Sequence, residues 1–196
     1  MLENQQIKRL LKLIARNNDQ AAYKELFVLF YYRLKRFGYS ILKSHEEAEE
    51  LVSDVFLLIW ERREQLLAID SPRLYIYTTT KNLALTRISR RKKQVDIAPE
   101  DWLVKLNSIY FDPEELIISE ETLRQINQAI YDLPPRCRLI FKLIKEDGLQ
   151  YKEVAELLNL SVKTVEAQMA IALRRIGKCM HLEINTSPTP QKEKKS

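Results

Sequence analysis

The chain has 196 residues, which allows one ordinary domain or two small ones, and its 45% hydrophobic and 30% charged residues exclude a disordered protein. Only three glycines occur among many Leu, Glu, Lys, Arg and Gln residues, so the composition favours helices over sheets. The net charge of +5 divides into +7 over residues 1–93, −6 over 94–120 and +4 over 121–196. Basic blocks suit a polyanion such as DNA, although a solvated surface produces the same bias.

Several function classes have no support in the sequence. Cys137, Cys179, His45 and His181 are isolated, so we expect no metal site and no cofactor, and two reduced cysteines. No nucleophile–base pair or phosphate loop suggests an enzyme. The N-terminus lacks a leader pattern, and no run approaches the roughly 18–20 apolar residues of a membrane span. We therefore expect a soluble cytoplasmic binding protein.

Residues 1–93 are predicted to be nearly continuous helix. Apolar side chains recur at helical spacing in the first part: Leu10, Leu11, Ile14, Tyr23, Leu26, Phe27 and Phe30. A break at 17–19 offers a cap for the next helix. Ser44 is expected to cap a helix from Glu46 to Glu64, with Glu47 completing a capping box. Pro72 suits the first turn of a further helix that runs to about Arg91.

The second half of the chain begins with a predicted linker. Residues 94–115 contain two prolines, several acids and no sustained period, and their Trp102, Tyr110 and Phe111 suggest that the linker docks. A second domain follows at 116–182. Its first helix is expected over Leu116 to Leu133, its second begins at Pro134-Pro135, and Asp147-Gly148 ends the second. Residues 183–196 have the composition of a disordered tail.

The stretch from Tyr151 to Arg175 is typical of a DNA-reading helix-turn-helix. Its first helix has apolar residues on one face, namely Val154, Ala155, Leu157 and Leu158. Asn159 tolerates the left-handed conformation of a tight turn, and Ser161 supplies an N-cap hydroxyl. Ala155 is small where the helices cross, and Val165 is apolar where the second packs back. An ordinary helical hairpin shares much of this pattern, but the combined spacing favours DNA binding.

The second helix of this unit would enter the major groove with its N-terminal residues foremost. Its polar face comprises Val162, Lys163, Thr164, Glu166, Ala167 and Gln168. Arg174, Arg175 and Lys178 follow near its end, where cations suit both the helix dipole and a DNA backbone.

An acidic helix is predicted over residues 48–60. Leu51, Val55, Leu58 and Ile59 would face a core, whereas Glu49, Glu50, Ser53 and Asp54 lie outward. A solvated face produces this pattern commonly. A protein-docking surface is the alternative, because the acidic charge would repel DNA.

The next helix, 72–93, interleaves aromatic, cationic and hydroxyl side chains. They are Arg73, Tyr75, Tyr77, Thr78, Thr79, Thr80, Lys81, Asn82, Arg87, Arg90, Arg91, Lys92 and Lys93. This pattern suits opened or single-stranded nucleic acid, in which bases stack and phosphates need counter-charges. Tyr75 and Tyr77 could instead pack in the core, and for one of the two we favour that interpretation.

The motif blocks and their order resemble a known family. Residues 48–60 read AEELVSDVFLLIW, 71–93 read SPRLYIYTTTKNLALTRISRRKK, and 133–144 with 151–176 read LPPRCRLIFKLI and YKEVAELLNLSVKTVEAQMAIALRRI. Over residues 20–180 the chain resembles the extracytoplasmic-function (ECF) sigma factors of the sigma-70 family, and most of all those of Bacteroidetes. The resemblance implies an all-α fold of two small helical domains: sigma region 2 at 1–93, an acidic linker at 94–115, the region 4 helix-turn-helix at 116–182, and a tail at 183–196.

The resemblance also implies partners and contact residues. Core RNA polymerase (β′ clamp helices and β flap) would meet Glu49, Glu50, Ser53, Asp54, Phe56, Leu57 and Trp60. The −10 promoter element would meet Arg73, Tyr75, Lys81, Asn82, Arg87, Arg90 and Arg91. The −35 element would meet Arg136, Arg138, Ser161, Val162, Lys163, Thr164, Glu166, Ala167, Gln168, Arg174 and Arg175. The linker would thread toward the RNA exit path. A membrane anti-sigma factor is a further expected partner, and no small-molecule substrate is expected.

The sequence departs from the family at five positions. It has Glu50 where Asp is frequent, Ser53 for Gln, Thr86 for Asp, Gln150 for Ser and Asn159 for Gly. None removes a charge pattern that the mechanism needs. Two other classes compete with the sigma-factor interpretation: an autonomous LuxR-type regulator, and a helical adaptor without a DNA role. Residues 49–60 distinguish a sigma factor from a LuxR-type regulator, because they should bind polymerase in the former and have no such partner in the latter.

Overall fold

The computed structural model describes residues 2–91 and 121–179, and every regular element in these ranges is helical. The N-terminal unit contains α1 Leu2–Asn17, α2 Gln20–Leu42, α3 His45–Glu61, the 3₁₀ helix η1 Gln65–Ala68 and α4 Pro72–Arg91. The C-terminal unit contains α5 Glu121–Tyr131, α6 Pro135–Lys145, α7 Tyr151–Leu158 and α8 Val162–Cys179. The all-α class is confirmed. The expected linker contacts of Trp102, Tyr110 and Phe111 and the tail lie outside the described residues.

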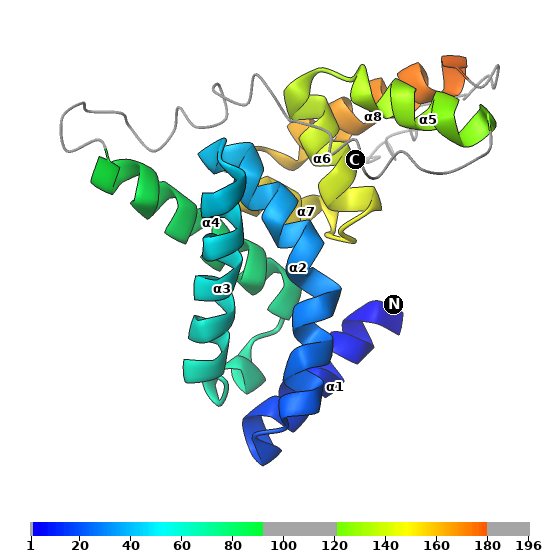
Figure 1. Ribbon diagram of the computed structural model, residues 1–196. Coiled ribbons are helices and arrows are strands. Elements are labelled where there is room, and N and C mark those ends of the chain that lie inside the picture. Colours follow the sequence, from blue (N-terminus) through cyan, green and yellow to red (C-terminus); the bar gives the residue numbers. More distant parts are fainter. Residues whose placement is uncertain (1, 92–120, 180–196) are drawn as a thin grey trace, which may run out of the picture.

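The long helix α2 organises the N-terminal unit, because α1, α3 and α4 all pack against it (Figure 1). Leu26, Phe30 and Leu34 recur every four residues along its buried face and are fully enclosed. At Gly38 the backbone of α2 passes so close to α3 that an added Cβ would lie 2.7 Å from Leu51 Cδ2. A side chain at this crossing would therefore require the Leu51 side chain to shift.

Local capping chemistry explains most helix boundaries. The Asp19 carboxylate accepts hydrogen bonds from the amides of Ala21 and Ala22 and starts α2. Lys43, with φ 60°, ends α2 in the left-handed conformation. The Ser44 hydroxyl then accepts from the Glu47 amide at 3.3 Å, so the predicted cap at Ser44 is confirmed.

The predicted end of this helix at Glu64 is wrong. α3 stops at Glu61, and a turn over 62–64 leads into η1. The bend allows Leu66 to be buried, and η1 packs against α1. Burial of one apolar side chain, worth about 1.5–3 kcal/mol, outweighs the favourable helix propensity of the residues at the turn.

In the C-terminal unit α8 packs against α5, α6 and α7. Its buried side chains are Val165, Met169, Ala172 and Ile176, which follow one helical stripe. α5 ends at Tyr131, just before the predicted boundary at Leu133. α6 begins at Pro135, as the pair of prolines predicts, because proline suits a first helical turn.

The two units are in contact. α7 packs against α4, and the connection between α6 and α7 reaches the end of α2 that carries Arg36 (Figure 1). Among the described helices, none is both long and apolar enough to cross a membrane.

Candidate nucleic-acid interface

The helix-turn-helix has the geometry that its sequence predicts. Asn159 ends α7 with φ 54° and ψ 50°, the left-handed conformation that glycine also adopts freely. The Leu160 amide donates to the Ala155 carbonyl at 2.8 Å and closes the turn. The Ser161 hydroxyl accepts from the Thr164 amide at 3.0 Å and caps α8. At the start of α7, Glu153 compensates for the missing Ser, because its carboxylate accepts from the Gln150 amide at 2.7 Å.

The predicted reading face of α8 is open to solvent. Lys163, Glu166 and Ala167 are exposed, and they alternate around the helix with the buried Val165 and Met169. The other members of the face are half-buried: Val162, Thr164 and Gln168. Arg174 and Arg175 are exposed farther along α8. This helix presents polar side chains and cations in the arrangement that a major groove accepts.

Arg138 does not belong to that open surface. Its side chain is only 8% exposed, donates to the Leu133 carbonyl at 3.0 Å and lies over the Tyr131 ring at 4.9 Å. Arg138 therefore holds the connection between α5 and α6, whereas Arg136 is half-buried nearby in sequence. The sequence predicts the charge of Arg138 but not its burial.

α3 exposes the acidic residues that its helical period places outward. Glu49, Glu50, Ser53 and Asp54 are exposed, and Leu57 is 56% exposed beside them in sequence. We call the four glutamates of its first turns, together with the outward Asp54, the acidic face of α3: Glu46, Glu47, Glu49, Glu50 and Asp54.

Two residues predicted to contact a partner from this helix lie inward. Phe56 is 1% exposed and packs against Phe27 with ring centroids 4.8 Å apart, so its assignment to a contact surface is corrected: it is a core residue. Trp60 is half-buried against Tyr23 at 5.1 Å, with Arg63 over its ring. Both side chains therefore pack α3 against α2.

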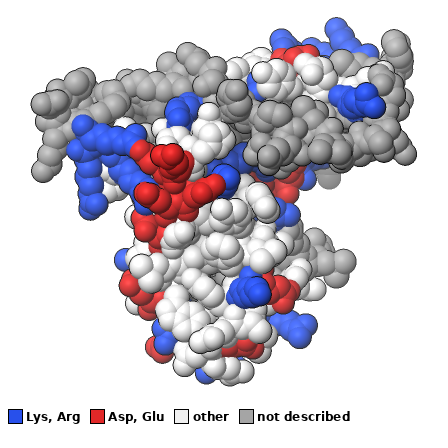
Figure 2. All heavy atoms as spheres, in the orientation of Figure 1, with Lys and Arg blue, Asp and Glu red and all other residues white. Residues whose placement is uncertain are grey.

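Cations from two other helices pair with four carboxylates of the acidic face of α3, and red and blue atoms adjoin there in Figure 2. Arg87 of α4 lies 2.5 Å from Asp54 and 3.3 Å from Glu50. Arg91 of α4 pairs with Glu47. Lys35 of α2 lies 2.7 Å from Glu49, and this contact lowers the pKa of that carboxyl.

The predicted nucleic-acid residues of α4 fall into three environments. Asn82 and Arg90 are exposed, and Tyr75 is half-buried. Arg87 and Arg91 pair with α3, as described above. Arg73 and Lys81 contact the C-terminal unit: Arg73 donates to the Gly148 carbonyl at 2.6 Å and Lys81 to the Leu157 carbonyl at 2.9 Å.

Tyr77 settles the choice between the two tyrosines of α4. Its side chain is fully enclosed and packs against Phe37 at 5.2 Å, so the core interpretation is confirmed for this residue. Burial raises the pKa of its hydroxyl well above the ordinary value. Tyr77 thus cannot stack on a base while the core is intact.

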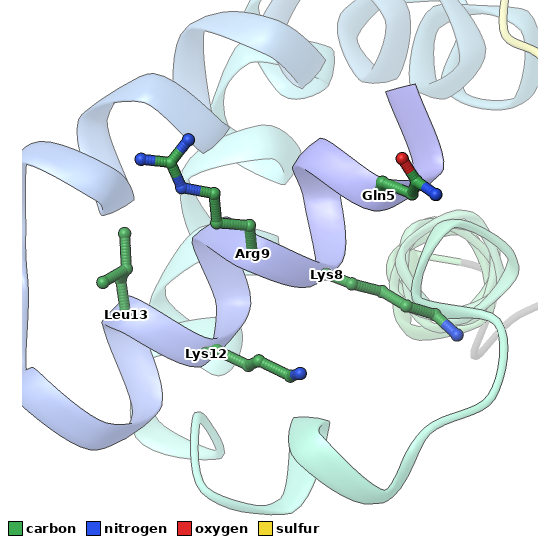
Figure 3. A pocket seen from close by; sticks show the side chains of 5 residues that line it. All are labelled: Gln5, Lys8, Arg9, Lys12 and Leu13. Atoms are coloured by element: carbon green, nitrogen blue, oxygen red, sulfur yellow. The ribbon is translucent and has the colours of Figure 1, made fainter. Parts of the chain in front are cut away.

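Sequence reasoning missed two surface features. Val28 and Tyr32, one turn apart on α2, are 65% and 71% exposed, and their position in an apolar run gave no sign of exposure. A shallow hollow on α1 is lined by Gln5, Lys8, Arg9, Lys12 and Leu13 (Figure 3). The lining comes from one helix, so this hollow is open surface. Within residues 2–91 and 121–179, no group of three His, Cys, Asp or Glu side chains could hold a metal ion.

These features define a class of protein: a helical nucleic-acid-binding protein that carries a helix-turn-helix and a separate acidic helix. Comparison with known families makes the class specific. Residues 26–94 match the family Sigma-70 region 2, and residues 123–176 match Sigma-70, region 4. The chain belongs to the sigma-70 family, in its ECF group.

Curated relatives agree with this assignment, and two solved structures share the fold. The chain is 26% identical to the ECF RNA polymerase sigma factor RpoE of Cereibacter sphaeroides, over 87% of this chain and 93% of the relative. It is 24% identical to the ECF RNA polymerase sigma factor SigK of Mycobacterium tuberculosis, over 87% and 91%. Its fold is similar to that of the sigma factor RpoE solved with the anti-sigma factor NepR from Bartonella quintana, with a TM-score of 0.52, 19% identity and coverage of 83% of this chain and 98% of that one. CnrH, solved with the cytosolic domain of CnrY, gives a TM-score of 0.50 at 17% identity, with coverage of 90% and 97%.

Proposed function

We propose that this chain directs core RNA polymerase to promoters as an ECF sigma factor. One observation supports this function over an autonomous regulator: the chain combines the exposed polar face of α8 with an exposed acidic helix, α3, in a separate unit. A LuxR-type regulator needs only the first of these. The chain acts by binding and positioning and performs no covalent chemistry of its own.

α8 would read the −35 element. Glu166, Ala167 and the half-buried Gln168 are placed to meet base edges, and Lys163 and Thr164 to meet phosphates. Arg174 and Arg175 would add contacts to the backbone. Arg138 has no direct role in this proposal, because its guanidinium is enclosed.

α4 would open and read the −10 element with Tyr75, Asn82, Arg87, Arg90 and Arg91. The exposed Asn82 and Arg90 are available without rearrangement. Arg87 and Arg91 must first leave the carboxylates of α3. An aromatic ring beside cations can stack an unpaired base, which contributes about 1–3 kcal/mol per base.

The acidic face of α3, with Ser53 and the exposed Leu57, would dock on the polymerase. Carboxylates around a half-exposed leucine provide steering charge and a desolvated contact together. The tethering of several weak sites would give the assembled enzyme its promoter affinity. The chain would act in the cytoplasm, where the polymerase is found, and an anti-sigma factor of the kind seen with the solved relatives would hold it inactive.

A pull-down tests polymerase docking most directly. The variant Glu50→Lys/Asp54→Lys should lose retention of core polymerase by tenfold or more, because each reversal turns an attraction into a repulsion of similar size. Glu61→Lys is the matched control, since Glu61 is an exposed acid at the far end of the same helix. Undiminished retention by the double variant would rule out α3 as the docking helix.

Run-off transcription tests the function as a whole. Core polymerase supplied with the purified chain should initiate at defined sites on genomic fragments, and the double variant should not. A chain that binds promoter duplex tightly and salt-resistantly without polymerase would instead favour the autonomous regulator.

A further inference from the structure

The exposed side of α1 is uniformly basic. Residues 4–17 contain no Asp or Glu, and all their cations are exposed: Lys8, Arg9, Lys12 and Arg16. Lys8, Lys12 and Arg16 follow one another at four-residue spacing, so they form one row about 12 Å long on the helix surface. We call these three residues the α1 row. The match to Sigma-70 region 2 begins at residue 26, so it assigns no role to α1.

The cations of α1 differ from the other cations of the N-terminal unit in having no partner. Lys35, Arg87 and Arg91 each lie against a carboxylate of α3. No side chain among the four cations of α1 makes an ion pair or a hydrogen bond with residues 2–91 or 121–179. A single solvated cation needs no explanation. A whole row without an acid beside it produces a positive potential that attracts a polyanion.

The α1 row lies next to the beginning of α4. In Figure 3, Lys8 and Lys12 extend to the side of α1 on which the chain passes from η1 into α4, and α1 packs against both of these elements. Arg9 extends to the opposite side, where it shares a hollow with Asp19 and Glu25. The row therefore adjoins the helix that exposes the predicted nucleic-acid residues of this unit.

The surroundings of the row favour a nucleic acid over other anionic partners. A helix that binds a membrane surface inserts its apolar face, but the apolar face of α1 is enclosed, with at most 3% exposed at Ile7, Leu10, Leu11 and Ile14. Protein interfaces are depleted in lysine, whereas surfaces that follow a phosphate backbone are rich in Lys and Arg. The observations therefore point to the phosphates of a nucleic-acid strand.

We propose that the α1 row is a phosphate-binding site, which holds the backbone of an opened DNA strand beyond the beginning of α4. Its cations meet phosphates as point charges and contact no base, so this site is independent of sequence. The row lengthens the strand-binding surface that α4 provides. The opened strand as its ligand rests on the proposed function of α4, whereas the binding of a polyanionic strand by α1 does not.

Fluorescence anisotropy with the full chain and a long oligothymidine tests the row. Lys8→Gln/Lys12→Gln keeps good helix formers at exposed positions and leaves Arg16, which also suits the end of the helix dipole. The slope of log K against log salt should fall in magnitude by about 1.4, since each phosphate contact with a single strand contributes about 0.7. Binding at 0.1 M salt should weaken about tenfold.

Arg9→Gln/Lys24→Gln is the matched control, because it removes the same charge outside the row. Arg9 lies on the other side of α1, and Lys24 is exposed on α2. The control should keep the wild-type slope and affinity. Circular dichroism checks that each variant is folded, and Lys12→Gln/Arg16→Gln repeats the measurement if the first variant is not.

Several outcomes would overturn the proposal. Wild type that does not bind the oligothymidine at 50 mM salt, or an unchanged slope in the row variant, would mean that the row is only solvated. Equal losses in the row variant and the control would show a general charge effect. A loss on duplex DNA but not on the single strand would assign the row to a duplex, and a loss confined to phosphatidylserine vesicles would assign it to a membrane. The assay contains neither polymerase nor promoter sequence, so its failure is distinct from a failure of run-off transcription, which would refute the sigma-factor function.

Discussion

Arg87 of α4 pairs at 2.5 Å with Asp54 of α3, so a cation expected at promoter DNA is held by a carboxylate expected at the polymerase. Arg87 is 22% exposed and Asp54 51% exposed, and such surface pairs contribute only about 0–1 kcal/mol. A pair this weak exchanges partners readily. In the free chain, the predicted DNA-contacting surface of α4 and the predicted polymerase-contacting surface of α3 therefore pair with each other.

Removing the carboxylate should release the cation. Asp54→Asn is expected to tighten binding of the free chain to single-stranded −10 DNA by about two- to fivefold at low salt, the equivalent of about 0.4–1 kcal/mol. The gain should vanish when Arg87→Gln is also present, which a double-mutant cycle by fluorescence anisotropy measures. Glu61→Gln controls for net charge. Equal gains from Glu61→Gln and Asp54→Asn would show a general charge effect rather than release of Arg87.

The reading face of α8 supports a prediction about salt. Lys163→Ala should weaken binding of the holoenzyme to every promoter sequence and reduce the slope of log K against log salt by about 1, because one phosphate contact is lost. Lys152→Ala on α7 is a control cation, exposed but outside the predicted set. Binding measured from 50 to 200 mM salt distinguishes the two. A loss confined to one promoter sequence would instead place Lys163 at a base.

Local chemistry made much of this fold predictable. The caps at Asp19, Ser44 and Ser161 and the left-handed turn at Asn159 depend on a few neighbouring residues, and the structure has all four. The end of α3 depended on burial of Leu66 against a distant helix, which no local pattern contains.

For the candidate site, too, the sequence predicted features that depend on one helix but not those that depend on contacts between helices. Helical period located the exposed acids of α3 and the open face of α8. It could not reveal that Arg87 turns back onto α3, or that Arg73 and Arg138 are enclosed, because these facts arise when separate helices meet. The long, flexible side chain of arginine can reach many partners, and the tertiary packing of the helices determines which of them it contacts.

Gly38 gives a prediction on stability. Gly38→Ala gains about 1 kcal/mol of helix propensity, but its Cβ would lie 2.7 Å from Leu51 Cδ2 in a fully enclosed part of the core. Overpacking costs about 1–3 kcal/mol, so we expect a net loss of up to about 2 kcal/mol in the free energy of unfolding. Urea denaturation measures it. Gly38→Ala/Leu51→Val should recover part of the loss, and a stabilised single variant would show that Leu51 moves aside without cost.

Asp147 should make stability depend on pH. Burial raises the pKa of its carboxyl from 3.8 to about 6, against the opposing effect of Arg36. The groups that face it are Arg36 and Arg33 from α2, Tyr77 from α4 and its neighbour Glu146. Since the folded state binds this proton more tightly than the unfolded state, the contribution of Asp147 to stability is fully present below about pH 4 and is lost as pH rises through about 6.

The expected size follows from the shift, because each pKa unit corresponds to about 1.4 kcal/mol. We compare the free energy of unfolding of the wild type with that of Asp147→Asn. The wild-type value minus the variant value should fall by about 2–3 kcal/mol between pH 4 and pH 7. Urea denaturation of both chains at each pH isolates this carboxyl, because the other acids titrate in both and cancel. A rise over the same interval would mean that Arg36 more than compensates for burial and holds the pKa of Asp147 below its ordinary value. A constant difference would mean that the Asp147 carboxyl is solvated in the folded chain, as it would be if the α6–α7 connection did not rest on α2 and α4.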